Sequence, residues 1–236
     1  MHSGVPSNGS GPTHMPKLAI VAALEREVRP LVKTWGLSEQ EHQGRRYRFF
    51  QHLHSVLVCG GIGAEAARRA SEAAIAIFDP QSVCSAGFAG ALDSNLQVGD
   101  ILRPRTVVSA SDGSAVTLGH GEGILISFMD VASPAQKSKL RESYGAQAVD
   151  MEAAAVARAA QSRNIPFTAI KAISDAADFN LPAMDRFVNP DGSLSEMRFA
   201  WFTALRPWWW PKVARLAANS RRASHALCQE LEKEIS

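Results

Sequence analysis

The sequence predicts an α/β fold in which helices cover both faces of a central sheet. Short continuous apolar runs, which are typical of strands buried on both faces, alternate along the chain with segments of helical pattern. The chain has 236 residues, 46% of them hydrophobic, so it can form one large domain with a substantial core. Because no internal repeat and no linker divides it, we expect a single domain.

The first half of the chain supplies three of the expected strands. The apolar run 18–24 predicts the first strand, and the charged segment EREVRPLVK after it predicts an amphipathic helix. The run 55–63 predicts a second buried strand, which leads into the helical segment AEAARRASEAAIAIF. The run 82–87 predicts a third strand, and we expect it to end in a Gly- and Ala-rich turn, GFAGAL.

The second half continues the alternation and then changes character. DILRPRTVV and GILISF predict further strands, with SDGS and LGHGEG as turns. MEAAAVARAAQSR predicts an Ala-rich helix, and the apolar run 165–173 predicts a buried strand that leads directly into Ser174 and Asp175. Beyond residue 178, a loop-like stretch precedes a basic, Trp-rich segment, 199–236, which predicts an amphipathic helical end.

The N-terminal residues 1–14 are polar, rich in Gly and Ser, and lack an apolar core. We expect them to be a disordered, artificial leader that does not belong to the fold. The natural start is then Met15, and the expected domain covers residues 15–236.

Composition and charge exclude several functional classes. A net charge of +2 argues against nucleic acid as a partner, and no stretch has the roughly 20 apolar residues that a membrane span requires. The three cysteines are few and widely spaced, as expected for a reduced, cytoplasmic chain without a zinc site. His52 and His54 are better explained by an exposed hairpin than by a metal site, because no third ligand is near, and we expect no metal.

Carboxylates recur where the predicted strands end. Glu27 follows the first strand within one helical turn, Glu152 follows AQAVD, and Asp175 follows the strand 165–173. In open α/β sheets, ligands bind outside the carboxyl ends of the strands. The three acidic side chains are therefore expected to converge on one ligand site.

Two simpler interpretations remain open at this point. Ser174 or Asp175 could cap a following helix by accepting its backbone N–H groups, as is common where a strand feeds a helix. GGIG and GFAG could belong to a dinucleotide site, but neither completes G-x-G-x-x-G with an acidic residue at the required distance. We expect no organic cofactor.

Five segments together resemble the purine nucleoside phosphorylase superfamily: IVAALEREV, GGIGAEAA, SAGFAGALDSNLQVGDI, VDMEAAAVA and KAISDAAD. They follow in order over most of residues 15–178. The nearest branch is that of the hydrolytic methylthioadenosine/S-adenosylhomocysteine nucleosidases. The resemblance implies a single-domain three-layer sandwich around a twisted mixed sheet, which usually forms oligomers, and a homodimer is the expectation here.

The resemblance also implies residue roles. Asp175 matches the acid that protonates N7 of the purine, and Glu27 matches the carboxylate that activates the attacking water. Glu152 matches the ligand of the ribose hydroxyls, Met151 the side chain packed on the sugar, and Ser174 the residue that steadies the acid. Cleavage of an N-glycosidic bond passes through an oxocarbenium-like state, which benefits from an acid on one side and water with a carboxylate on the other. Burial is expected to favour the protonated form of the acid by raising its pKa.

Departures from the family pattern bear on the nucleophile. Ser85 stands where phosphorylases of this superfamily place a phosphate-binding arginine, and Phe88 replaces a hydroxyl residue. Without these groups, binding a phosphate dianion is costly, so we expect water as the nucleophile. The water contact is then expected to shift to backbone groups of Ala89 and Gly90. Phosphorolysis stays open, because Arg103 and Arg105 could supply charge.

A second departure concerns the substrate's 5′ side. The segment between VGDI and SFMD is shorter than in the methylthioadenosine enzymes, and the purine-stacking aromatic has only Phe128 as a candidate, for which core packing is an equal alternative. A short lid implies a more open mouth and a bulkier 5′ substituent.

The tail carries Trp208, Trp209 and Trp210 beside basic residues, which fits helix packing, a subunit interface or contact with lipid. A short lid with a Trp-rich tail resembles the hopanoid-associated branch, whose implied substrate is adenosylhopane. The three tryptophans would then contact the lipid tail of this substrate, and the cytoplasmic enzyme would touch the inner face of the membrane peripherally.

Other interpretations stay open beside this prediction. Methylthioadenosine, S-adenosylhomocysteine or a futalosine-like nucleoside could be the substrate instead. Outside catalysis, the chain could be a nucleoside-binding module or a peripheral membrane protein with a purely structural core. Intact Glu27, Glu152 and Asp175 argue against a module without activity.

Overall fold

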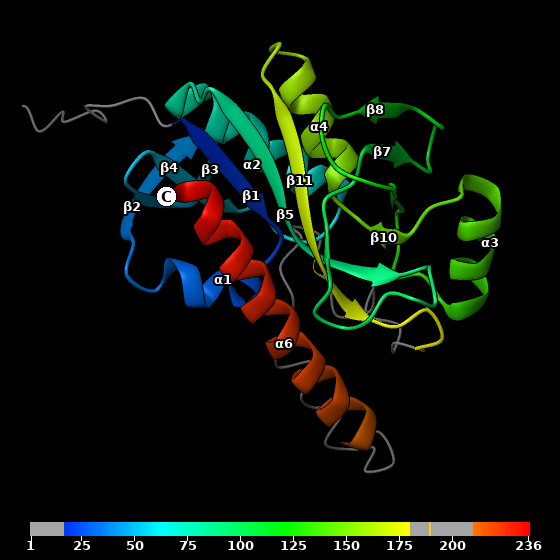
Figure 1. The fold of residues 1–236 in the computed structure, drawn as a ribbon. Coiled ribbons are helices and arrows are strands. Elements are labelled where there is room, and N and C mark those ends of the chain that lie inside the picture. The colour runs from blue at the N-terminus through cyan, green and yellow to red at the C-terminus, as the bar shows by residue number, and fades with distance from the viewer. Residues whose placement is uncertain (1–16, 180–188, 190–209) are drawn as a thin grey trace, which may run out of the picture.

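The computed structural model describes residues 17–179, 189 and 210–236 (Figure 1). A mixed sheet of eleven strands forms its centre, in the order β2-β3-β4-β1-β5-β10-β9-β7-β8, with β11 paired to β5 and β6. The strands are β1 (Leu18–Ala22), β2 (Gly36–His42), β3 (Arg45–His52), β4 (Ser55–Cys59), β5 (Ser82–Ala91), β6 (Ile101–Leu102), β7 (Thr106–Ser109), β8 (Ala115–Thr117), β9 (Ile124–Ser127), β10 (Ala148–Asp150) and β11 (Phe167–Asp175). The helices are α1 (Glu25–Val32), α2 (Ala64–Phe78), α3 (Pro134–Tyr144), α4 (Ala153–Gln161) and α6 (Trp210–Ile235).

The parallel part of the sheet lies at its centre. β1 runs parallel to both β4 and β5, and β5 also runs parallel to β11. The carboxyl ends of β1, β5 and β11 therefore meet at one edge. β10 pairs antiparallel with β5 and parallel with β9, so the sheet is mixed.

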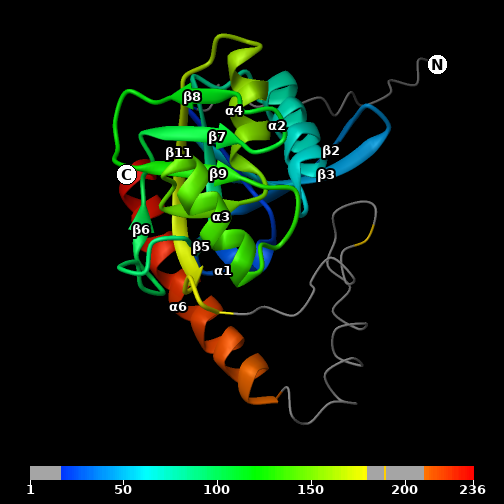
Figure 2. The same ribbon diagram turned by 90° about the vertical axis from the view of Figure 1, so that its right-hand side faces the viewer.

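The side chains of β1 alternate between two cores, because successive residues of a strand point to opposite faces. Ala19 and Val21 pack in a cluster with residues of α2 and α4, whereas Ile20 and Ala22 pack in a cluster with residues of α1 and α6. Figures 1 and 2 show these two helix pairs on opposite sides of the sheet. The predicted α/β sandwich of three layers around a mixed sheet is confirmed.

The prediction of a turn at GFAG is wrong. β5 continues without interruption through these residues to Ala91, because β11 pairs with it along most of its length and β10 pairs with its last residues. The glycines therefore serve close packing in a strand rather than chain reversal. β11 likewise extends to Asp175, with an irregularity in its register between Ile173 and Asp175.

Other expectations can be compared with the structure directly. His52 and His54 lie in an exposed β3–β4 hairpin, as predicted. α6 covers the described part of the expected C-terminal helix, and its N-terminal half projects beyond the body of the molecule (Figure 2). The expected leader, Trp208 and Trp209 lie outside the described residues. Among the described helices, none combines the length and apolarity needed to cross a membrane.

Candidate active site

A cavity of about 1220 Å³ opens where the sheet edge meets α1 and α6. Its walls come from the carboxyl ends of β1, β10 and β11, from α1, from the residues around α3, and from α6. The acidic residues Glu27, Asp150, Glu152 and Asp175 line it, together with Asp130. The three carboxylates predicted to converge therefore share one cavity, although the first and the last are 148 positions apart in the sequence.

Glu27 lies in the third position of α1 and is only 6% exposed. No described residue donates a hydrogen bond to its Oε2 atom. Burial and the nearby charge of Glu152 raise the pKa of Glu27 to about 7, and Lys171 partly opposes this shift. Buried polar atoms normally have hydrogen-bond partners, so Oε2 is ready to accept a hydrogen bond from water or a ligand in the cavity.

Glu152 immediately precedes α4, and two backbone groups fix its carboxylate. The N–H of Gly63 donates to Oε1 over 2.8 Å, and the N–H of Met151 donates to Oε2 over 3.3 Å. Each oxygen keeps a second lone pair for a hydroxyl group. Burial and the charge of Asp150 raise the pKa of Glu152 to about 7, against the opposing effect of Lys171.

Lys171 provides the positive charge beneath these acids. It is 1% exposed in the middle of β11, and its Nζ lies 2.9 Å from Oδ2 of Asp150 and donates to Oγ of Ser85 over 3.0 Å. Burial lowers its pKa, but the surrounding carboxylates outweigh burial and leave the pKa raised. Gly87 permits this arrangement, because a Cβ there would lie 3.1 Å from Oε2 of Glu27.

Asp175 is 3% exposed and accepts hydrogen bonds at both oxygens. Ser174 Oγ donates to Oδ1 over 2.7 Å, and Lys137 of α3 pairs with Oδ2. No helix follows within residues 176–179, and no described backbone N–H donates to this carboxylate. Within the described residues, helix capping therefore does not account for Asp175.

The remaining predicted site residues divide into two groups. Met151, Ser174, Phe88 and Gly90 line the cavity. Ala89 and Phe128 are not among the lining residues: Ala89 is 2% exposed in β5, and Phe128 packs against a core cluster around β9 and α3. The contact of the Ala89 backbone with the attacking water and the contact of Phe128 with the purine stay predictions, and core packing, the alternative for Phe128, agrees with its position.

Sequence reasoning did not identify Lys137, Lys171 or the wall formed by α6. Lys171 had a signal, since a lysine inside an apolar strand must find a buried partner. Lys137 had none, because it lies in a polar helix beside the similar but exposed Lys139. The α6 wall comprises Val213, Leu216, Ala217, Ser220, Arg221, Ser224 and His225.

The two arginines considered for phosphate binding lie elsewhere. Arg103 forms ion pairs with Glu230 and Glu234 of α6, both at 2.7 Å. Neither Arg103 nor Arg105 lines the cavity. Ser85, expected to stand in place of a phosphate-binding arginine, is fully buried and accepts a hydrogen bond from Lys171.

The chain is similar in sequence and in fold to known nucleosidases. The aminodeoxyfutalosine nucleosidase of Campylobacter jejuni is 26% identical over 200 residues, which are 69% of this chain and 87% of that protein. The 5′-methylthioadenosine/S-adenosylhomocysteine nucleosidase of Staphylococcus epidermidis is also 26% identical, over 68% of this chain and 87% of that protein. A solved Helicobacter pylori nucleosidase of the same type, complexed with a small molecule, superimposes with a TM-score of 0.69 at 19% identity and covers 93% of this chain and 97% of that one.

The sequence profile of the Phosphorylase superfamily matches residues 17–134 and 123–195, which hold all three convergent carboxylates. The matched part is well over half of the chain. The protein therefore belongs to the phosphorylase superfamily.

Proposed function

We propose that the protein is a purine nucleosidase that hydrolyses the N-glycosidic bond of a 5′-substituted adenosine and releases adenine, and that adenosylhopane is its substrate. One observation carries the proposal: Glu27, Glu152 and Asp175 face a common cavity, with a buried oxygen of Glu27 lacking a partner among the described residues. The relatives bear the names of nucleosidases for aminodeoxyfutalosine and for methylthioadenosine and S-adenosylhomocysteine, which agrees with this chemistry.

Each acidic residue has a role that its surroundings suit. Asp175 delivers a proton to N7 of the purine, so that the electron pair of the breaking C1′–N9 bond is accepted by a better leaving group. Glu27, with a pKa of about 7, accepts the proton of the water that attacks C1′. Glu152 accepts hydrogen bonds from the ribose hydroxyls, and Met151 packs on the sugar beside it.

Water is the nucleophile that the charges favour. A phosphate dianion requires cations that are not already neutralised. Lys171, the buried cation beside Glu27, already pairs with Asp150 and donates to Ser85, and Arg103 pairs with α6. The arginines and lysines that line the cavity apart from Lys137, namely Arg26, Arg29, Lys33 and Arg221, are exposed to solvent on α1 and α6. The unpaired acidic oxygen of Glu27 would repel a phosphate but accept a hydrogen bond from water.

The cavity is larger than a nucleoside needs. Pockets for small ligands commonly measure about 300–1,000 Å³, and this one is about 1220 Å³. Ser224, in the interior of α6, donates a hydrogen bond to the carbonyl of Glu27 over 2.9 Å, so this part of the helix lies beside Glu27. Val213, also lining the cavity, lies 11 residues earlier, or about 16 Å along the helix axis. A long apolar 5′ substituent would fill this extension against Val213, Leu216 and Ala217.

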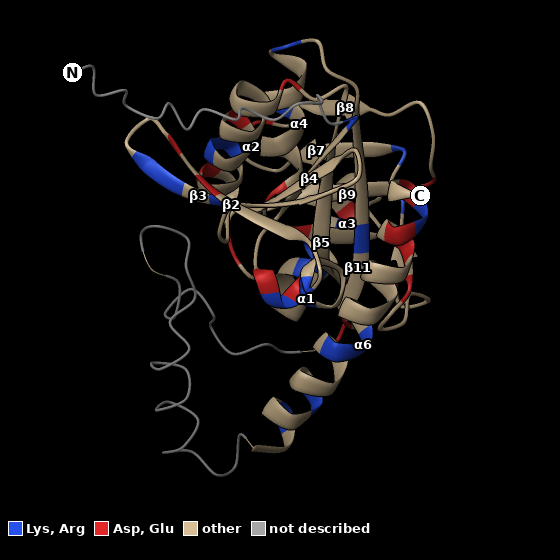
Figure 3. Cartoon of the chain, turned by 90° about the vertical axis from the view of Figure 1, so that its left-hand side faces the viewer, with Lys and Arg blue, Asp and Glu red and all other residues tan. Residues whose placement is uncertain are grey.

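A membrane surface would bring such a substrate to the cavity. Trp210 at the start of α6 is 57% exposed, and Arg29 and Lys33 of α1 are exposed at the cavity rim. Figure 3 shows lysines and arginines along both α1 and the projecting half of α6. Aromatic and basic side chains together favour contact with lipid headgroups. The proposed enzyme accordingly touches the inner face of the membrane peripherally, and the family resemblance adds the proposal of a cytoplasmic homodimer.

The decisive experiment measures adenine release from a panel of nucleosides, each with and without phosphate. The panel contains adenosylhopane, methylthioadenosine, S-adenosylhomocysteine and aminodeoxyfutalosine. We expect release without phosphate, with the highest kcat/KM for adenosylhopane. Strict dependence on phosphate would contradict hydrolysis, and faster turnover of methylthioadenosine would contradict the lipid-linked substrate.

The role of Asp175 is tested by Asp175→Asn. Because an amide cannot deliver the proton, we expect kcat to fall by about 10²- to 10⁴-fold while the circular dichroism spectrum stays unchanged. Asp178→Asn is the matched control, since Asp178 is exposed three residues further on and does not line the cavity. Near-normal adenine release by Asp175→Asn would contradict the assignment.

A further inference from the structure

Lys137 is a buried ammonium group that the mechanism above does not use. It is 2% exposed and lines the cavity from the first turns of α3. Its Nζ pairs with Oδ2 of Asp175 and donates to the carbonyl of Ala176 over 2.8 Å. Lysine is rarely buried unless it is paired, and both members of this pair are nearly inaccessible.

The surroundings of Lys137 hold the ammonium group in place. Ser133 and Gln136 form a capping box at the start of α3, and the backbone N–H of Lys137 donates to the carbonyl of Ser133 over 2.8 Å. On the other side, Gly90 lets the strand approach closely, because a Cβ there would lie 3.3 Å from Nζ of Lys137 and 2.9 Å from Oδ2 of Asp175.

The hydrogen bonds at Asp175 raise the question of where its proton comes from. Ser174 occupies Oδ1 and Lys137 occupies Oδ2, so both oxygens act as acceptors in this structure. An acid that protonates a leaving base must first acquire a proton. Of the two donors, only the ammonium group of Lys137 becomes neutral when it gives up a proton, whereas the hydroxyl of Ser174 would become an alkoxide.

We propose, building on the nucleosidase function above, that Lys137 is a positioning residue that supplies the proton of the departing adenine through Asp175. When the C1′–N9 bond breaks, its electron pair passes to the purine, whose N7 takes a proton from the carboxyl group of Asp175. Asp175 in turn takes a proton from Nζ of Lys137, which becomes a neutral amine. Water adds to C1′ and gives its proton to Glu27, and exchange with solvent restores both groups.

Substrate binding provides the reason for the transfer. A nucleoside that fills the cavity removes the remaining water from a pair that is already nearly inaccessible, with 3% and 4% of the Lys137 and Asp175 side chains exposed. Desolvation disfavours the charged forms of both partners, so the neutral amine and carboxylic acid become more accessible than in the open cavity. The carboxylic acid form of Asp175 therefore becomes available when the purine is bound beside it.

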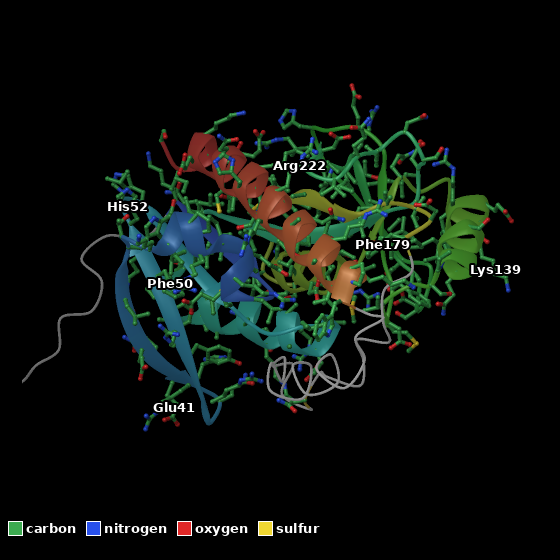
Figure 4. The ribbon with its side chains drawn as sticks, turned by 90° about the horizontal axis from the view of Figure 1, so that it is seen from below. Glu41, Phe50, His52, Lys139, Phe179 and Arg222 are labelled. Atoms are coloured by element: carbon green, nitrogen blue, oxygen red, sulfur yellow. The ribbon has the colours of Figure 1, made fainter. Side chains whose placement is uncertain are left out.

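The test compares Lys137→Arg and Lys137→Met with wild type, with Lys139→Met as the matched control. Arginine keeps the positive charge beside Asp175 but cannot give up a proton. Methionine removes the charge at similar length. Lys139 lies on the same helix, is exposed, and does not line the cavity (Figure 4). The kcat and KM of each variant are measured from pH 5 to 9 with the adenosyl substrate that wild type cleaves fastest.

We expect Lys137→Arg to lower kcat by about 10²- to 10⁴-fold at every pH, with little change in KM. For Lys137→Met, we expect the ratio of its kcat to that of wild type to rise as the pH falls, because Asp175 then takes its proton from solvent. Dividing by the wild-type value removes the titration of Glu27, which both proteins share. Lys139→Met should match wild type throughout.

Two results would overturn the inference: Lys137→Arg with more than half of the wild-type kcat, or a Lys137→Met ratio that does not change with pH. Thermal unfolding checks each variant, and if Lys137→Met does not fold, the charge-conserving Lys137→Arg decides alone. Failure of the proposed function is a separate outcome, since wild type would then release no adenine from any substrate of the panel.

Discussion

Glu27 carries a buried carboxyl group whose pKa of about 7 lies well above its ordinary value of 4.5. Between these two values the folded protein binds a proton that the unfolded chain has released. The free energy of unfolding therefore falls as the pH rises from about 4.5 to about 7, and stays lower above that range. The site is accordingly built at a cost in stability near neutral pH.

We expect Glu27→Gln to remove this cost. At pH 8 the variant should be more stable than wild type, by up to about 3 kcal/mol, whereas near pH 4 the two should be equally stable. Its kcat should fall by about 10²- to 10⁴-fold, because an amide cannot accept the proton of water. Urea unfolding at both pH values and adenine release measure these effects.

The control for this prediction is Glu25→Gln. Glu25 lies in the same helix but pairs with Arg48 at the surface, where such a pair contributes little. We expect Glu25→Gln to change the free energy of unfolding by less than about 1 kcal/mol and to leave kcat unchanged. An equal stability difference between Glu27→Gln and wild type at both pH values would show that burial of the charge is not the cause.

The sequence predicted which residues line the site where those residues lie at the end of a strand. Glu27, Glu152 and Asp175 each follow or complete a buried strand, and the rule on strand ends was enough to assign them to one edge. Lys137 could not be found this way, because its partner lies 38 residues away and its own helix has a polar pattern. For Phe128 the sequence left core packing and ligand contact equally open, because an aromatic on a strand suits a core as well as a ligand, and the side chain packs against a core cluster.

Among the elements, β5 departs most from the expectation. Its glycines look like a turn in sequence, yet they lie in a paired strand because other parts of the site approach it closely. Gly90 in particular lies against both Asp175 and Lys137. Local sequence could not reveal this, because the groups that exclude a side chain come from β11 and α3.

Gly90→Ala tests this role of the strand. Its added methyl would lie 2.9 Å from Oδ2 of Asp175 and 3.2 Å from Cε of Lys137, so the ion pair must shift. We expect a loss of about 1–3 kcal/mol in stability. We also expect kcat to fall, because the carboxyl group of Asp175 is displaced from N7 of the purine. Thermal unfolding and adenine release measure the two effects.

The matched control for the strand is Gly119→Ala. Apart from its chain neighbours, Gly119 has no described heavy atom within 4 Å of the point where a Cβ would stand, so the added methyl meets open space. The substitution should leave both stability and turnover near wild type. A Gly90→Ala protein with full activity would show that the close approach at β5 is not required for the acid to work.

For the whole molecule, the sequence predicted the layers but not the extent of the cavity. Alternation of strands and helices is encoded locally, so the covered sheet followed from periodicity. The docking of α6 is different, because its sequence pattern indicates only an amphipathic helix. The pattern does not show that Ser224 donates a hydrogen bond to Glu27, or that the preceding turns of the helix line the cavity. That placement depends on contacts between the two ends of the chain.

Two leucines of α6 separate its structural role from its proposed role in substrate choice. Leu227 is fully buried, so Leu227→Ala should cost about 2–5 kcal/mol in stability while leaving KM unchanged. Leu216 lines the cavity, so Leu216→Gln should lower kcat/KM for adenosylhopane about tenfold more than for methylthioadenosine, because only the longer substituent reaches that far along the helix. Urea unfolding and steady-state kinetics provide both readouts. Equal losses for the two substrates would mean that the extension of the cavity along α6 does not hold the 5′ substituent.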